Sequence, residues 1–135
     1  MKALITAVAT AWISFAALAA GGQPSEAEIA AAFKKADRDN GGTVRWAEAA
    51  NFGILKEAFE HANPDKDGTL DIKEFQAAIT YQFDKANPDN DGTLDRKEAA
   101  KAGIKSKTIF NEANPDNDGT LDRSEYLRAL TLQAR

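Results

Sequence analysis

The apolar residues of this chain recur at fixed distances around four polar segments of twelve residues. The segments are Asp37–Glu48, Asn63–Glu74, Asn87–Glu98 and Asn114–Glu125. Each segment has a Val or Leu at its eighth position, and a Phe stands four residues before the first residue of each segment. Because residues four apart share a helix face, these Phe residues are predicted to pack on the inner faces of helices that enter the segments. The pattern predicts an all-α fold of four helix–loop–helix units, entered at Phe33, Phe59, Phe83 and Phe110.

The connections between the segments are short. Only twelve residues, Phe75–Ala86, separate the second segment from the third. They make one helix of about 18 Å, so the helix leaving loop two is predicted to enter loop three as well. Two loops at opposite ends of one straight helix cannot pair with each other. We expect shared helices between consecutive units generally, although Gly53 and Gly103 are candidate breaks in the longer connections, Ala49–Ala62 and Ala99–Ala113.

The N-terminal region has the pattern of an export signal. Lys2 is followed by an uncharged run, Ala3–Ala20, and Ala17–Ala19 has the small-x-small spacing of a cleavage site. We predict a signal peptide over residues 1–19 and a periplasmic or secreted mature protein; the alternative is a retained membrane anchor. Residues 20–24 are predicted to be flexible, and residues 25–135 to form the domain. Ser25 and Glu28 predict a capping box at its first helix.

Composition narrows the classes of function. The chain of 135 residues has a formal net charge of −4, and removal of Lys2 with the signal makes it −5. This charge argues against nucleic acid or an anionic membrane as the main partner. The chain has no Cys and a single His, His61, so disulfides, thiolate sites and multi-histidine zinc sites are excluded.

The four segments carry oxygen ligands at alternating positions around a glycine. In all four, position 6 is Gly and position 12 is Glu. Six to eight oxygens are what Ca²⁺ requires, and Gly permits the sharp turn that brings them together. This is the EF-hand pattern, in which the apolar eighth residues of two paired loops form a short backbone ladder. We predict three strong metal sites, formed by Asn63, Asp65, Asp67, Thr69, Asp71 and Glu74, by Asn87, Asp89, Asp91, Thr93, Asp95 and Glu98, and by Asn114, Asp116, Asp118, Thr120, Asp122 and Glu125.

Loop one departs from this pattern. Gly41 stands where the others have Asp, and Arg45 places a cation at position 9. We expect this loop to bind metal weakly or not at all and to serve mainly as a structural partner. Its weaker candidate ligands are Asp37, Asp39, Thr43 and Glu48. The other three loops differ from the strict motif by having Asn at position 1, which removes one negative charge.

Four features together resemble lanmodulin, a family of small periplasmic EF-hand proteins. They are the short spacing, the export signal, Pro at position 2 and Asp at position 9 of loops two to four. The resemblance covers Phe33–Leu130 and implies preference for trivalent lanthanides over Ca²⁺. It implies carboxylate ligands at positions 3, 5, 9 and 12, namely Asp65, Asp67, Asp71 and Glu74, then Asp89, Asp91, Asp95 and Glu98, then Asp116, Asp118, Asp122 and Glu125.

The sequence therefore predicts a binder of Ca²⁺ or lanthanide(III) ions that is partly unfolded without metal and folds on binding it. The alternative is a metal-dependent sensor that engages a partner protein. Sensors of this kind hold partner helices in grooves lined by adaptable Met side chains, and the only Met in this sequence is Met1. An enzyme is not expected, because no Ser or Lys has an identifiable activating partner and the acids belong to loops. No feature identifies a protein partner.

Overall fold

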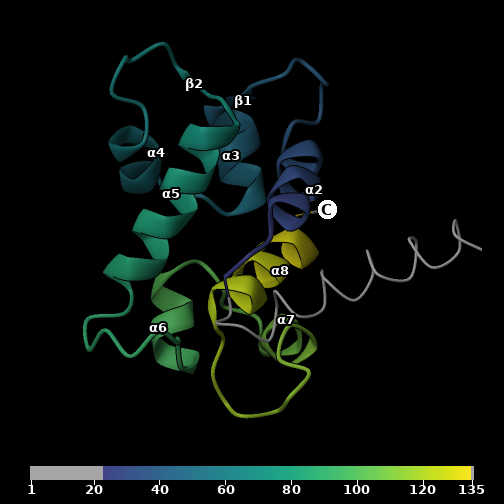
Figure 1. Ribbon diagram of the computed structural model, residues 1–135, viewed down its shortest axis with the longest axis vertical. Helices are drawn as coiled ribbons and strands as arrows, with labels where there is room; N and C mark the ends of the chain where they lie inside the picture. Colours follow the sequence, from purple (N-terminus) through teal and green to yellow (C-terminus); the bar gives the residue numbers. More distant parts are fainter. Residues whose placement is uncertain (1–22, 135) are drawn as a thin grey trace, which may run out of the picture.

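The computed structural model describes residues 23–134 of the chain. In this part, seven short helices and one pair of very short strands are joined by loops (Figure 1). The predicted signal peptide and most of the predicted flexible segment lie outside these residues. Among the described helices, none has the length and apolar character needed to cross a membrane. The elements are α2 (Glu26–Ala36), β1 (Val44–Arg45), α3 (Trp46–Phe52), α4 (Lys56–His61), β2 (Thr69–Leu70), α5 (Ile72–Lys85), α6 (Arg96–Lys101), α7 (Lys107–Glu112) and α8 (Arg123–Gln133).

The four loops form two pairs at opposite ends of the molecule (Figure 1). Loops one and two pair through antiparallel β1 and β2, with Val44 opposite Leu70. Loops three and four pair through a single bridge, in which Leu94 and Leu121 exchange two backbone hydrogen bonds of 2.8 Å. All four position-8 side chains are fully buried. The predicted ladder between apolar eighth residues is therefore confirmed.

Helix α5 joins the two loop pairs. It runs for 14 residues from loop two to loop three, so the predicted shared helix is confirmed at this position. The broader prediction of shared helices throughout is wrong. Gly53, at φ +113°, ends α3 before α4 begins, and Gly103, at φ +98°, lies between α6 and α7. Both glycines adopt backbone angles that side chains with a Cβ rarely take, so each longer connection splits into two short helices.

The core is built on the phenylalanines that the sequence pattern selected. Phe33, Phe59, Phe83 and Phe110 are all buried. Helix α2 packs against α8 and α5, where the Phe33 and Phe75 ring centroids are 5.3 Å apart. The Ser25 and Glu28 capping box is present at the start of α2. These contacts place the entering helices so that the loops lie at the two ends of one continuous core.

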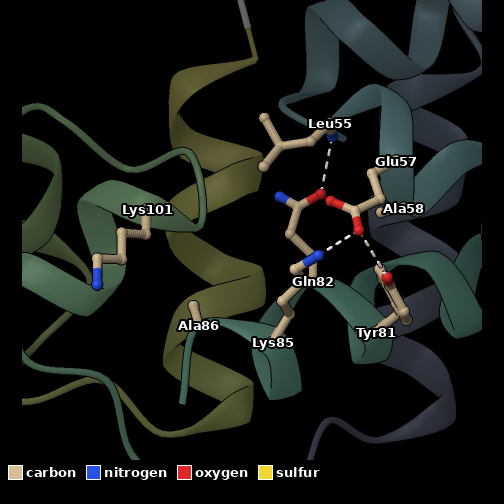
Figure 2. A pocket seen from close by; sticks show the side chains of 8 residues that line it. All are labelled: Leu55, Glu57, Ala58, Tyr81, Gln82, Lys85, Ala86 and Lys101. Carbon is tan, nitrogen blue, oxygen red and sulfur yellow. Dashed lines mark hydrogen bonds and ion pairs between the residues drawn. The ribbon is translucent and has the colours of Figure 1, made fainter. Parts of the chain in front are cut away.

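A buried glutamine connects the α3–α4 turn at Gly53 with the α6–α7 turn at Gly103. Gln82, in the last turn of α5, donates from Nε2 to the carbonyl oxygens of Gly53 (2.9 Å) and Ala102 (2.8 Å) and to the hydroxyl of Tyr126 (2.7 Å). Its Oε1 accepts a hydrogen bond of 2.8 Å from the backbone of Leu55 (Figure 2). The Gln82 side chain thus bonds to the turns between α3 and α4 and between α6 and α7, and to α8.

Candidate metal sites

The four loops share one backbone conformation. Position 4 has positive φ in each, at Asn40 (58°), Lys66 (55°), Asn90 (58°) and Asn117 (58°), and the glycine at position 6 has φ between 80° and 88°. Two left-handed residues two apart reverse the chain around a common centre. The glycine was identified from sequence, whereas position 4 was missed. Asn at three of the four positions was the available signal, because Asn tolerates this conformation better than most residues.

The carboxylates at positions 3 and 5 are held by the turning backbone. In loop two, Oδ1 of Asp65 accepts from the backbone N–H of Asp67 at 3.3 Å, and Oδ1 of Asp67 accepts from that of Thr69 at 2.9 Å. Loops three and four repeat both bonds with nearly the same lengths. The same two bonds therefore orient the side chains at positions 3 and 5 in each of loops two to four.

The asparagine at position 1 points its amide into each of the three loops. In loop two the inward atom of the Asn63 amide lies 2.8 Å from Asp65 Oδ1, 3.0 Å from Asp67 Oδ1 and 3.2 Å from the Thr69 carbonyl oxygen, and these are hydrogen bonds when that atom is the nitrogen. Asn87 and Asn114 repeat the arrangement. All three side chains are more than nine-tenths buried. With the amide oxygen inward, four oxygens would surround the centre of the loop and repel one another unless a cation lay among them.

The acids at positions 9 and 12 also cap the helix that leaves each loop. Asp71 Oδ1 accepts from the Glu74 backbone at 2.8 Å, and Glu74 Oε1 accepts from the Asp71 backbone at 2.9 Å. The same capping box occurs at Asp95 with Glu98 and at Asp122 with Glu125. One oxygen of each carboxylate is thus used by the helix, which leaves the second oxygen of each for a ligand.

Loop four brings three of its acids close together. Carboxylate oxygens of Asp116, Asp118 and Glu125 lie within 4.8 Å of one another. Burial, reinforced by the negative charges of Asp122, Asp116 and Asp118, raises the pKa of Glu125 to about 7. Burial also raises the pKa of Asp122. Burial and mutual repulsion disfavour the ionised form of these carboxylates, and a cation between them would stabilise it. The residues of loop four therefore fit a hard metal ion.

Loop one is closed by its own side chains. Asp37, Asp39 and Glu48 also gather within 4.8 Å, but Arg45 Nη2 lies 2.9 Å from Asp39 Oδ2 and Nε lies 3.9 Å from Glu48 Oε1. The two oxygens of Asp37 accept from the backbones of Gly41 and Gly42. A hydrogen bond to Asp37, with the Gly41 backbone and Arg45, lowers the pKa of Asp39. These contacts support the expectation that loop one acts as a structural partner.

The position-10 side chains, which the sequence did not assign as ligands, reach across to the partner loop. Arg123 of loop four lies over Phe83 at 4.5 Å, and Arg96 of loop three lies over Phe110 at 4.6 Å. Trp46 of loop one packs edge-on against Phe59, with 5.4 Å between centroids. Trp46 is thus a packing residue. The pairing of loops is therefore made by these cross-contacts as well as by the backbone bridges.

A pocket of about 190 Å³ lies beside the hydrogen bonds of Gln82, which we call the Gln82 node. It is lined by Leu55, Tyr81, Gln82 and the Glu57–Lys85 ion pair (Figure 2). Its volume is below the range of about 300 to 1,000 Å³ that small-molecule sites occupy. His61 is exposed and stacks on Tyr81 with 4.0 Å between ring centroids. Neither feature brings together a nucleophile and a base.

Comparison with known proteins supports the loop assignment. Residues 105–133, which include loop four, match a family model described as an EF-hand domain pair. Among solved structures, a homolog of programmed cell death 6 protein from Leishmania major is similar over 73% of this chain and 71% of that one, with 16% identity and a TM-score of 0.33. No curated protein matches the sequence.

Proposed function

We propose that this protein is an exported metal-binding protein whose loops two, three and four bind Ca²⁺-class hard cations. The observation that carries the proposal is the inward amide of Asn63, Asn87 and Asn114, which is buried and has carboxylate and carbonyl oxygens of its own loop around it. An ion placed among them would be held by positions 1, 3, 5, 7 and 12, with the second oxygen of the position-9 Asp nearby. When bound, the ion supplies the positive charge that these oxygens lack.

Charge favours a trivalent ion in these loops. Each of loops two to four has four carboxylates, at positions 3, 5, 9 and 12. Coulomb attraction scales with ion charge, so La³⁺ gains more from these groups than Ca²⁺ of similar size. We therefore propose that lanthanide(III) ions bind more tightly than Ca²⁺. Loop one, with its internal Arg45, contributes packing to loop two.

Metal is also proposed to complete the folding of the chain. Acids crowded in two loop pairs repel one another without a cation, and this repulsion acts against the helices that the same acids cap. Export is proposed from the N-terminal pattern of Lys2 and the uncharged run Ala3–Ala20. The protein would then meet its ions outside the cytoplasm.

The test is a titration of the mature chain, residues 20–135, with La³⁺ and separately with Ca²⁺ in chelator-buffered series. Helicity is followed by circular dichroism and bound ions are counted by calorimetry. We expect helicity to rise with both ions, at far lower free La³⁺ than Ca²⁺, with three ions bound strongly. Equal responses to the two ions would overturn the lanthanide preference. No response to either would overturn metal binding itself.

A different outcome would favour the sensor alternative. A metal-dependent sensor would recover a partner protein in a pull-down only when metal is present. If the protein only binds metal, as proposed above, its metal affinity should be the same with and without other proteins. The two functions are separated by repeating the La³⁺ titration in the presence of any captured protein.

A further inference from the structure

Without a cation, the asparagine at position 1 makes hydrogen bonds in its loop in only one of the two orientations of its amide. Rotating the amide by half a turn about the Cβ–Cγ bond exchanges its oxygen and nitrogen at the same inward place. With nitrogen inward, Asn87 donates to Asp89 Oδ1 (2.7 Å), Asp91 Oδ1 (2.9 Å) and the Thr93 carbonyl (3.1 Å), and its oxygen accepts from the Gly92 backbone at 3.1 Å. Loops two and four show the same two alternatives.

We propose that Asn63, Asn87 and Asn114 are two-position amides that close their loops in both states of the protein. In the metal-free protein the NH₂ group points inward and replaces the cation as the donor to the loop oxygens. In the metal-bound protein the carbonyl oxygen points inward as a ligand. This inference rests on the metal binding proposed above and assigns position 1 a role that an acid cannot perform.

The two orientations differ in what the loop centre must contain. With oxygen inward, every group around the centre is an acceptor, which is favourable only around a cation. With nitrogen inward, the amide offers two N–H groups to three oxygens, and the bond from the Gly92 backbone is satisfied as well. Asn87 is buried whereas Asp89 and Asp91 are exposed, so water can reach the carboxylates but the buried amide depends on the loop for its partners and turns when the ion leaves.

Loop one provides an internal comparison within the same chain. Its position 1 is Asp37, which has no hydrogen to donate, and the two Asp37 oxygens point to backbone N–H groups instead. The side-chain donor to Asp39 is the guanidinium of Arg45. Besides backbone N–H groups and threonine hydroxyls, each loop therefore directs one nitrogen-bearing side chain at its acids. The donor is a neutral amide that can turn away in loops two to four and a fixed cation in loop one.

The amide makes the metal-free loop more stable and the metal less tightly bound. Binding must break the inward N–H bonds before the carbonyl can serve as ligand, so part of the ion's attraction is spent on that change. An Asp at position 1 would have no such bonds to lose, and it would add one charge to the loop. Asn at position 1 is thus proposed to set both the order of the empty loop and its ion affinity.

The first test uses side-chain amide NMR on the full mature chain, before and after addition of La³⁺, which is diamagnetic, or Ca²⁺. Asn90 and Asn117 are internal controls, because they lie exposed at position 4 of the same loops. Without metal, we expect the NH₂ protons of Asn87 and Asn114 to exchange with solvent at least about ten-fold more slowly than those of Asn90 and Asn117. Saturation with La³⁺ should remove most of this protection.

The second test uses matched substitutions that add the same charge to the same loop. Asn87→Asp replaces the amide, and Asn90→Asp leaves it in place; Asn114→Asp and Asn117→Asp repeat the comparison in loop four. We expect Asn87→Asp to lower metal-free helicity more than Asn90→Asp. We also expect it to raise La³⁺ affinity about ten-fold, against less than about three-fold for Asn90→Asp.

The failures of the two proposals are distinguishable. Equal exchange rates for Asn87 and Asn90 in the metal-free protein, or equal effects of their substitutions, would overturn the two-position amide while leaving metal binding intact. Slow exchange of Asn87 with no spectral response to La³⁺ or Ca²⁺ would overturn the metal-binding function. In that case the amide would close the loop permanently, which also contradicts the second position proposed here.

Discussion

The guanidinium of Arg123 lies 4.5 Å from the ring centroid of Phe83, so the tenth residue of loop four covers the phenylalanine that enters loop three. The reciprocal contact, Arg96 over Phe110, is 4.6 Å long. Arg123 also forms an ion pair with Asp84, one residue beyond Phe83. The two loops are thus joined at their rims by two cation–π contacts as well as by the Leu94–Leu121 bridge.

Replacement of Arg123 should loosen this end of the molecule. We expect Arg123→Ala to lower the free energy of unfolding of the metal-free protein by about 1 kcal/mol, mainly through loss of the cation–π contact, since exposed ion pairs contribute little. Urea unfolding followed by circular dichroism measures it. Arg128→Ala, at an exposed position of α8, is the control and should change stability by less than about 0.5 kcal/mol. Equal losses in both variants would contradict the role of the contact.

Loop one should gain metal dependence when its internal cation is removed. In Arg45→Asp the acids Asp37, Asp39 and Glu48 lose their only guanidinium and gain a fourth carboxylate. We expect a fourth, weaker La³⁺ ion in calorimetry and a metal-dependent change in Trp46 fluorescence. Trp46 is the one Trp outside the predicted signal peptide, so the signal reports on this loop pair.

Arg38→Asp is the matched control for that experiment, because it makes the same charge change at an exposed position of the same loop. It should leave the ion count at three. A fourth ion in both variants would mean that overall charge, and not the place of Arg45, sets the occupancy of loop one. A fourth ion in the unmodified protein would show that Arg45 does not replace the metal.

The Gln82 node should be essential to stability. In Gln82→Leu the backbone N–H of Leu55 and the carbonyl of Gly53 lose their side-chain partner, while the Ala102 carbonyl keeps its bond from Tyr126. Buried polar groups without partners cost about 1–3 kcal/mol each, so we expect a loss of about 2–4 kcal/mol in urea unfolding. Gln76→Leu, exposed on the same helix, should be nearly neutral. A loss below about 1 kcal/mol in Gln82→Leu would show that water replaces the node.

The metal-free protein should become less stable as pH rises toward neutrality. Burial and neighbouring acids raise the pKa of Glu125 from 4.5 to about 7, so between these values the folded state holds a proton that the unfolded chain has released. Stability therefore falls as pH rises through this window and levels off above it. Urea unfolding from about pH 5 to about pH 8 measures the slope. Glu125→Gln should flatten it, leaving a smaller slope from Asp122; an unchanged slope would exclude Glu125 as the source.

Much of the fold could be predicted from short-range patterns. The Phe–loop spacing predicted the entering helices, the twelve residues Phe75–Ala86 predicted the shared helix, and the apolar eighth residues predicted the ladder. The general prediction of shared helices failed at Gly53 and Gly103. A glycine in a helical stretch is compatible with either a continuous or a broken helix, and the contacts of Gln82 with both corners are visible only in the folded chain.

The sequence by itself determined which atoms each loop offers, because ligand type, the glycine turn and the capping acids lie within twelve consecutive residues. Only the tertiary structure decided which loops pair, where Arg45 and Arg123 place their charge, and how deeply the position-1 amides are buried. Those properties depend on residues distant in the chain that meet across one core. Whether a carboxylate or an amide is stable in a loop depends on the water and the donors that packing leaves within its reach.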